Sequence, residues 1–392
     1  MYLHQRLNEK EGAASMKKCI VIPDSFKGTM SSAEVSEIIK KQLLLHYPDC
    51  NVVAIPAADG GEGTVDCFLS CIENAHKIKV LSTNAFGEKI NCYYALYNNT
   101  AIIEMAQCAG LPQAEGRLNP AITTTYGVGT IIKEAISNGC KNIILGLGGS
   151  CTNDGGTGMA AALGVTFINK RGEDFIPTGA TLCDIDRIET GKAKELLKDC
   201  SFTAMCDITN PMFGKNGAAY IFAPQKGADE KMVKHLDDNL MHLSGKIKEF
   251  IGVDVSNIPG AGAAGAMGAA VVAFLNGKLQ SGINTILDTV KFNTHLIGCD
   301  VVFTGEGKVD GQSIHGKVIS GVSKAAQKQN IPVIIIAGSV GDGAEKTYSI
   351  GVSAIFSINQ MPMEFNKAKK FSKANLAATT DSILRLYKAN NW

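Results

Sequence analysis

Residues 146–164 read Gly-Leu-Gly-Gly-Ser-Cys-Thr-Asn-Asp-Gly-Gly-Thr-Gly-Met-Ala-Ala-Ala-Leu-Gly, and the expected organisation of the chain starts from them. The apolar residues 142–145 before this stretch predict a short buried strand, and the small residues 159–163 at its end predict a helix. The glycines in between permit positive φ angles and let a ligand approach the backbone. A glycine-rich turn that opens a helix points free N–H groups outward, and such a site favours anions.

Asp154 is the one carboxylate in this stretch, and it would repel a bound anion unless a cation lay between them. The Ser-x-Thr-Asn-Asp cluster at residues 150–154 is also more polar than a tight turn requires. We therefore interpret residues 146–158, called the cradle below, as a site for an anion and a metal ion. The alternative is a tight strand–helix turn that binds nothing.

The composition restricts the class of protein. The 392 residues suggest two domains or three, and 45% hydrophobic with 19% charged residues is ordinary for a globular protein. A net charge of +1 argues against nucleic acid or an anionic membrane as partner. The twelve cysteines are scattered without a Cys-x-x-Cys motif, which favours reduced thiols over a zinc site or a disulfide framework. The chain shows no secretory signal or membrane-spanning stretch, so we expect a cytoplasmic protein.

Both ends of the chain repeat a strand, a polar glycine-rich loop and a helix, which indicates a parallel α/β layer. Strands are predicted at 19–22 and 51–55 near the start, and at 301–303 and 333–337 near the end. Between them, residues 77–103 alternate like antiparallel hairpins. We therefore predict an α/β fold in which a Rossmann-like parallel-sheet domain is built from both chain ends and a second, mixed α/β domain is inserted. The predicted limits are 1–76 and 285–392 for the first domain and 77–284 for the second.

Acidic residues recur in glycine-rich turns that follow predicted strands, and lysines stand near them. Phosphoryl transfer uses carboxylates for magnesium, cations and N–H groups for phosphate, and a base for the acceptor hydroxyl. The pattern therefore predicts a phosphotransferase. The acids are Asp59, Glu62, Asp154, Asp207, Glu306 and Asp310, and the lysines are Lys27, Lys308 and Lys317.

Residues 311–318 almost match the Gly-x-x-x-x-Gly-Lys-Ser/Thr phosphate loop. The match fails at Val318, which has no hydroxyl for magnesium. The segment also lies several residues beyond the predicted strand end, so a P-loop ATPase is rejected. Lys317 keeps a predicted role as a point charge that neutralises phosphate.

Eight segments of the chain together identify a resemblance that no one of them carries alone. They are 23–28, 58–64, 123–129, 146–164, 207–211, 222–228, 259–268 and 304–317. With these segments in the family's order over residues 17–380, the chain resembles the type 1 glycerate kinases of bacteria (glycerate 2-kinases). Cys151 stands where the family often has alanine, and the chain has an N-terminal extension.

This resemblance implies ATP-dependent phosphorylation of D-glycerate to 2-phosphoglycerate, with the active site between two α/β domains. With the acids described above, we expect Mg²⁺ to be required in addition to ATP. Formation of 3-phosphoglycerate, or action on another small hydroxy acid, remains an alternative. A non-enzymatic glycerate sensor would need degraded acids, which the chain does not show. The sequence leaves open whether the chain acts alone or as a homodimer.

Site roles follow from the chemistry of a 2-hydroxy acid acceptor, whose carboxylate must be held by hydrogen-bond donors. We predict that the donors come from the cradle, with Ser25 as a further contact from the first domain. The predicted substrate-binding residues are Ser25, Gly148, Gly149, Ser150 and Asn153.

A general base must lie within hydrogen-bond reach of the 2-hydroxyl. We predict Asp207 as this base, because it ends another strand of the middle domain, with Asp154 binding magnesium or orienting the substrate. Lys27 is the predicted phosphate cation, brought in by domain closure. The predicted nucleotide-binding residues are Gly305, Gly307, Lys308 and Lys317, and the predicted metal ligands are Asp59, Glu62, Glu306 and Asp310.

Overall fold

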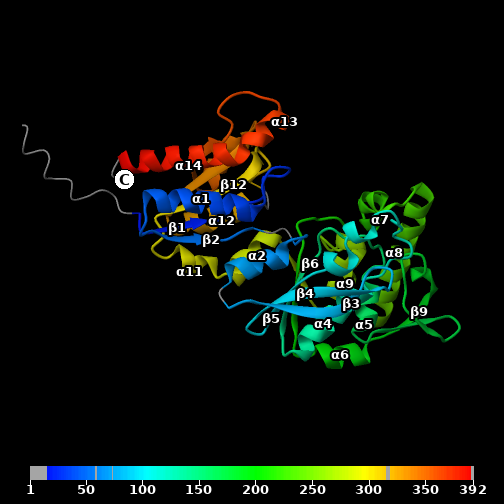
Figure 1. Ribbon diagram of the computed structural model, residues 1–392. Helices are drawn as coiled ribbons and strands as arrows, with labels where there is room; N and C mark the ends of the chain where they lie inside the picture. Colours follow the sequence, from blue (N-terminus) through cyan, green and yellow to red (C-terminus); the bar gives the residue numbers. More distant parts are fainter. Residues whose placement is uncertain (1–15, 58–59, 73, 315–317, 390–392) are drawn as a thin grey trace, which may run out of the picture. The chain divides into compact units, whose positions relative to one another are not determined.

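The protein is described from a computed structural model, which covers residues 16–57, 60–72, 74–314 and 318–389 (Figure 1). The chain forms two compact units. Unit 1 contains the described residues of 1–58 and 286–392, and unit 2 contains those of 59–285. The sequence predicted domain limits near residues 76 and 284, and for the functional domains these limits stay a prediction.

Unit 1 is built on a five-stranded sheet in the order β14-β13-β12-β1-β2, and all of its strand pairs are parallel. Cys19 of β1 pairs with Val301 of β12, so the two ends of the chain share one sheet, as predicted. Counted along this unit the strand order is 2-1-3-4-5, the flavodoxin-like doubly wound arrangement. The strands are β1 (Lys18–Val21), β2 (Asn51–Ala54), β12 (Val301–Val309), β13 (Val333–Val340) and β14 (Val352–Ser357).

Alternate residues of the central strands face two separate apolar layers. Ile334 and Ile336 of β13 pack with helices α1 and α14, whereas Ile335 and Ala337 pack with α12 and the turn η5. This two-residue alternation is the pleat of a strand that is covered on both faces. The helical elements are α1 (Ser32–His46), α11 (Phe292–Leu296), α12 (Val318–Gln327), η5 (Ala344–Ile350), α13 (Phe365–Ala368), η6 (Lys369–Phe371) and α14 (Ser372–Ala389).

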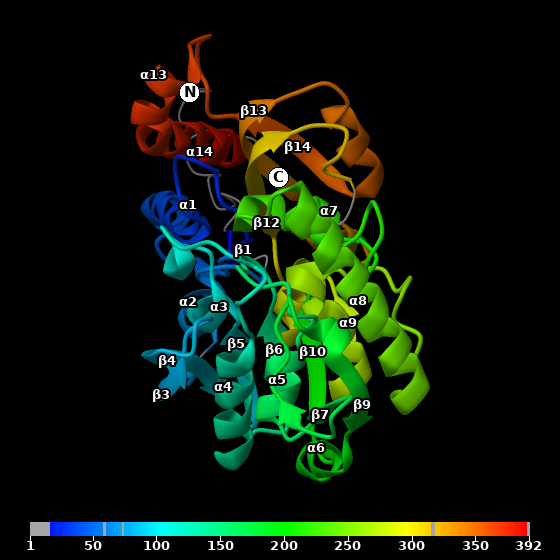
Figure 2. The ribbon, with the colours of Figure 1, turned by 90° about the vertical axis from the view of Figure 1, so that its right-hand side faces the viewer.

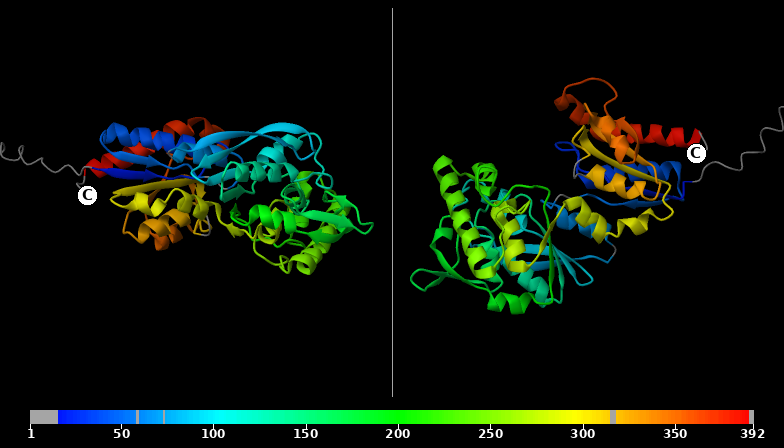
Figure 3. Two further views of the ribbon diagram at one scale, coloured as in Figure 1. Left: turned by 90° about the horizontal axis from the view of Figure 1, so that it is seen from below. Right: turned by 180° about the vertical axis from the view of Figure 1, so that it is seen from behind.

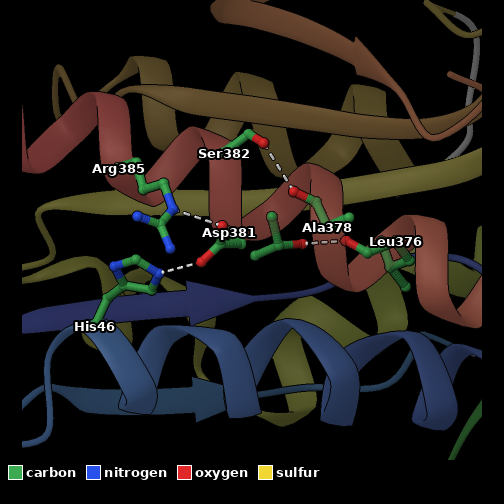
Figure 4. Close-up of polar contacts among 7 residues, drawn as sticks. His46, Leu376, Ala378, Asp381, Ser382 and Arg385 are labelled. Atoms are coloured by element: carbon green, nitrogen blue, oxygen red, sulfur yellow. Dashed lines mark hydrogen bonds and ion pairs between the residues drawn. The ribbon is translucent and has the colours of Figure 1, made fainter.

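Helices α1 and α14 lie side by side (Figure 3), and polar contacts join them (Figure 4). Asp381 accepts from His46 Nε2 and from Arg385 Nε, each at 2.7 Å. The N-terminus of α1 carries a capping box, in which Ser31 and Glu34 satisfy each other's backbone N–H groups. Helix α1 therefore begins at Ser32, directly after its cap residue Ser31.

Unit 2 is built on a six-stranded sheet in the order β11-β10-β6-β5-β4-β3 (Figure 2). Four neighbouring strands, β11, β10, β6 and β5, are parallel, whereas β5, β4 and β3 form the predicted antiparallel meander. A small antiparallel sheet, β8-β7-β9, was not predicted. The strands are β3 (His76–Thr83), β4 (Lys89–Tyr97), β5 (Thr100–Glu104), β6 (Asn142–Gly146), β7 (Thr166–Asn169), β8 (Asp174–Phe175), β9 (Ile185–Glu189), β10 (Ser201–Met205) and β11 (Lys278–Gln280).

The main core of unit 2 lies between this sheet and helices α4, α5, α8 and α9. Ile103, Ile143 and Leu145 of the sheet are buried against them. Among the described residues, no helix is long and apolar enough to cross a membrane. The helical elements are α2 (Thr64–Cys71), α3 (Ala106–Ala109), η2 (Pro112–Ala114), α4 (Tyr126–Ser137), α5 (Thr157–Ala162), η3 (Leu182–Asp184), α6 (Gly191–Leu197), α7 (Ala218–Phe222), η4 (Pro224–Lys226), α8 (Glu230–Ile251), α9 (Ala263–Leu275) and α10 (Gly282–Thr289).

Candidate active site

The cradle (residues 146–158) leaves β6 at the carboxyl edge of the unit 2 sheet and leads into α5. Its middle is tied to the segment after β5, because the Cys151 N–H donates to the Ala109 carbonyl at 2.8 Å. Gly156 has a φ of +70°, and a Cβ built there would lie 2.3 Å from the Cβ of Ala270. Only glycine therefore fits this position, both for the turn and for the close approach of α9.

Asp154 lies at the centre of the cradle and is fully buried. Its Oδ2 accepts from the N–H and hydroxyl of Thr125, at 2.7 and 2.8 Å, and from the Gly158 N–H at 3.3 Å. Its Oδ1 accepts from the Gly156 N–H at 3.1 Å. Burial raises the pKa of this carboxyl, and the four hydrogen bonds oppose that rise. The carboxylate therefore holds the starts of α4 and α5 together, while its predicted catalytic role stays a prediction.

Ser150 and Asn153 are buried side chains of the cradle with different surroundings. Ser150 Oγ accepts a hydrogen bond from Lys226 Nζ at 2.8 Å. Asn153 is fully buried, yet neither its Oδ1 nor its Nδ2 has a hydrogen-bond partner among the described residues. A buried amide without partners costs about 1–3 kcal/mol for each unsatisfied atom, so a missing polar partner is expected here. A ligand or a water molecule would supply it.

The glycine-rich loop at residues 60–63 crosses the carboxyl ends of β6 and β10. A Cβ on Gly146 would lie 2.4 Å from the Gly60 carbonyl oxygen, and a Cβ on Gly60 would lie 2.9 Å from the Cβ of Met205. The backbones therefore touch only because both positions are glycine. Glu62, a predicted metal ligand, is exposed in this loop and so lies at the same edge as the cradle.

The predicted substrate donors are only partly brought together. Gly149, Ser150 and Asn153 share the cradle, and the exposed Gly149 N–H has no acceptor among the described residues. The Gly148 N–H instead donates to the Gly60 carbonyl at 2.9 Å, so it is already engaged. Ser25 belongs to unit 1, where its N–H donates to Asp24 at 2.6 Å.

Asp207, the predicted base, follows β10 at the same sheet edge. Met205 of β10 pairs with Gly146 of β6, so Asp207 is level with the start of the cradle. Its side chain is exposed, and its Oδ1 accepts from the Gly282 N–H at 2.9 Å. An exposed carboxylate at the edge that carries the cradle has the access that a general base needs.

Unit 1 presents its own edge between β1 and β12, where the strand order reverses. Ligands of open α/β sheets bind at the carboxyl ends of the strands beside such a reversal. The Asp24 N–H donates to the Gly305 carbonyl at 2.7 Å, which fixes the loop after β1 on β12. Lys27 is exposed in this loop, and a Cβ on Gly307 would lie 3.3 Å from its backbone nitrogen.

The prediction that a loop begins after residue 303 is wrong, because strand β12 continues to Val309. Position 305 requires glycine, because a Cβ there would lie 2.0 Å from the Ile336 carbonyl oxygen of β13. Buried Glu306 accepts a hydrogen bond from the Ser313 hydroxyl. Lys308 pairs with Asp310 at 3.2 Å (Nζ to Oδ2).

Two predicted site residues, Asp59 and Lys317, lie outside the described residues. Within the described part of the chain, no three His, Cys, Asp or Glu side chains converge as a ligand set for a metal ion. Magnesium is usually held by one or two carboxylates together with water and substrate phosphates. The carboxylates of Glu306 and Asp310 are hard oxygen donors of this kind, so they fit Mg²⁺ carried in with a nucleotide.

Comparison with known proteins decides the family. A sequence profile described as the Glycerate kinase family matches residues 19–388, nearly the whole chain. The chain belongs to the glycerate kinase family. It is therefore a phosphotransferase, as predicted from its residues and from the resemblance.

Relatives named as glycerate kinases match this chain over most of their own length. The glycerate kinase of Bacillus cereus (strain ATCC 10987 / NRS 248) is 42% identical over 95% of this chain and 98% of the relative. The glycerate 2-kinase of Escherichia coli (strain K12) is 43% identical over 87% of this chain and 90% of the relative. A crystal structure of a candidate glycerate kinase 2 from Salmonella typhimurium LT2 is similar with a TM-score of 0.84 and 37% identity, covering 95% of this chain and 98% of that one.

Two buried charged residues beside the cradle were not predicted from the sequence. Lys226 is buried beside Ser150, although lysine is usually exposed and its loop gave no sign of burial. Glu104 ends β5 next to Gly146 and accepts from the Val65 N–H at 2.5 Å. Burial raises the pKa of Glu104. An acid at the end of the apolar run 101–103 was the available signal for it.

Proposed function

We propose that the protein transfers the γ-phosphoryl group of ATP to the 2-hydroxyl of D-glycerate and forms 2-phosphoglycerate. Membership of the glycerate kinase family supports glycerate as the acceptor. The name of the Escherichia coli relative, glycerate 2-kinase, supports position 2.

The observation that carries this proposal is the amide of Asn153, which is fully buried in the cradle with neither polar atom partnered among the described residues. Its Nδ2 donates and its Oδ1 accepts. A 2-hydroxy acid offers the matching pair, a carboxylate oxygen that accepts and a hydroxyl that donates. Ser150 and the Gly149 N–H supply further donors for the carboxylate.

The proposed base, Asp207, follows β10 at the sheet edge that carries the cradle. Asp207 takes the proton of the 2-hydroxyl while that oxygen bonds to the γ-phosphorus. The bond from the γ-phosphorus to the β,γ-bridging oxygen breaks, and ADP leaves with that oxygen. Lys27 neutralises charge on the transferred group.

Bound Mg²⁺ would neutralise charge on the nucleotide phosphates. Glu306 and Asp310 are the described residues that we propose as its ligands, together with Glu62 and with Asp59, which lies outside the described residues. Gly305, Gly307 and Lys308, with Lys317, are the proposed contacts of the nucleotide.

The test is product analysis by phosphorus NMR after incubation with ATP, MgCl₂ and D-glycerate. The expected result is a signal of 2-phosphoglycerate that grows as ATP is lost, and no reaction when the magnesium is chelated. Formation of 3-phosphoglycerate would show that the 3-hydroxyl of D-glycerate, and not the 2-hydroxyl, accepts the phosphoryl group. Faster turnover of another hydroxy acid, or no transfer to D-glycerate, would reject the proposed acceptor.

A further inference from the structure

Lys226 is the most unusual charged residue of unit 2. It ends the short turn η4 (Pro224–Lys226), and only 1% of its surface is exposed. Its Nζ donates to the Ser150 hydroxyl at 2.8 Å and to the Thr152 carbonyl at 2.6 Å. Both acceptors are neutral atoms of the cradle.

The ammonium of Lys226 has no carboxylate within ion-pair distance among the described residues, the limit being 4.0 Å. Burial lowers the pKa of Lys226 to about 8, and its interactions with Cys151 and Asp154 only partly oppose this shift. Taking an ammonium ion out of water is costly, and two neutral acceptors offset only part of that cost. The interior beside the cradle therefore carries a positive charge that a nearby anion would stabilise.

The hydrogen bond from Lys226 also fixes the direction of Ser150. A lysine ammonium has no lone pair, so Ser150 Oγ must be the acceptor in their contact. The hydroxyl hydrogen of Ser150 then points elsewhere and is available as a donor. Asn153, three residues further along the cradle, has an amide without partners among the described residues. The cradle therefore holds two side-chain donors, Ser150 Oγ–H and Asn153 Nδ2, that are available to a ligand.

We propose that Lys226 is a positioning residue that secures the carboxylate of the hydroxy-acid substrate through Ser150. This inference rests on the proposed binding of glycerate in the cradle. Lys226 does not touch the substrate: its charge strengthens Ser150 as a donor to the carboxylate, in a medium of low dielectric constant.

The decisive experiment compares Lys226→Met, Ser150→Ala and the double variant, each with saturating ATP. We expect Lys226→Met to raise the KM for D-glycerate about 10- to 100-fold, the range for losing one charge-assisted contact, while the KM for ATP stays within about 2-fold. Because Lys226 acts through Ser150, the KM of the double variant for D-glycerate should exceed that of the more impaired single variant by no more than about 3-fold. Lys231→Met, at an exposed position on α8, is the matched control.

The pH profile separates positioning from mere support of the fold. As the pH rises through about 8, Lys226 loses its proton, so the wild-type KM for D-glycerate should rise. Cys151 and Asp154 are the titratable groups that act on Lys226, and both remain in Lys226→Met, which should lack this rise. Ser150→Ala, which removes one hydroxyl, should also lack it and serves if Lys226→Met does not fold.

The outcomes are distinct. An unchanged KM for D-glycerate in folded Lys226→Met, or a rise near pH 8 that persists in both variants, overturns the positioning role. Full multiplication of the two single effects in the double variant overturns the path through Ser150. If the wild-type protein does not phosphorylate D-glycerate at all, the proposed function fails first, and the variants are not needed to show it.

Discussion

Replacing Asp154 by alanine tests how the cradle is held. The change removes the acceptor of three backbone N–H groups, those of Thr125, Gly156 and Gly158, inside a fully buried site. Each buried donor left unsatisfied costs about 1–3 kcal/mol. Relief of a buried charge, which is why the pKa of this carboxyl is raised, offsets part of that sum. We expect Asp154→Ala to lower the free energy of unfolding by about 3–5 kcal/mol.

Asp154→Asn is the matched variant, because its amide has the same shape. With its oxygen in the place of Oδ2, it still accepts from Thr125 and Gly158, and only the Gly156 N–H faces an NH₂ group. The expected loss is therefore about 1–3 kcal/mol, clearly smaller than for alanine.

Urea denaturation followed by fluorescence and circular dichroism measures both losses. A loss below about 1 kcal/mol for Asp154→Ala, or equal losses for the two variants, would refute this reasoning about orphaned donors. The same Asp154→Asn protein also decides the predicted catalytic role, because loss of an acid–base group lowers kcat by about 10²–10⁴.

Three further variants test the proposed base, the proposed phosphate cation and the turn of the cradle. Asp207→Asn should lower kcat about 10²- to 10⁴-fold in a steady-state assay at saturating magnesium, and a value within a few-fold of wild type or of the exposed control Asp199→Asn would eliminate Asp207 as base. Lys27→Met should raise the KM for ATP or lower kcat about 10-fold or more, with the KM for D-glycerate unchanged; equal kinetics would remove Lys27 from the phosphate site. Gly156→Ala should destabilise the protein by about 1–3 kcal/mol in thermal unfolding, because its φ is +70° and a Cβ would meet Ala270 at 2.3 Å; an unchanged midpoint would show that the turn relaxes.

The sheet of unit 1 was predictable because its strands are short apolar runs with a helix after each. Residues 19–22 and 301–303 carry that signal from opposite ends of the chain, and they pair in the structure. The extension of β12 through Gly305 was not predictable, since glycine in a strand interior weakens the strand. The glycine is required by the carbonyl of Ile336, a contact between residues distant in sequence.

The candidate site divides in the same way. The cradle and the acids were visible because glycines and polar side chains cluster after strands. How deeply Lys226 is buried depends on the packing of segments that are distant in sequence, and so does the lack of partners for Asn153 among the described residues. The residues next to each of them in the sequence do not reveal this packing. Glu104 had a local signal, an acid at the end of an apolar run, but only pairing of β5 with β6 brings it beside Gly146.

The central claim is that the cradle holds the carboxylate of the acceptor. A crystal structure of the protein with D-glycerate and a non-hydrolysable ATP analogue tests it most directly. We predict a carboxylate oxygen of glycerate about 2.7–3.2 Å from Asn153 Nδ2 and from Ser150 Oγ. Glycerate bound elsewhere, with a water molecule satisfying the Asn153 amide, would contradict the account.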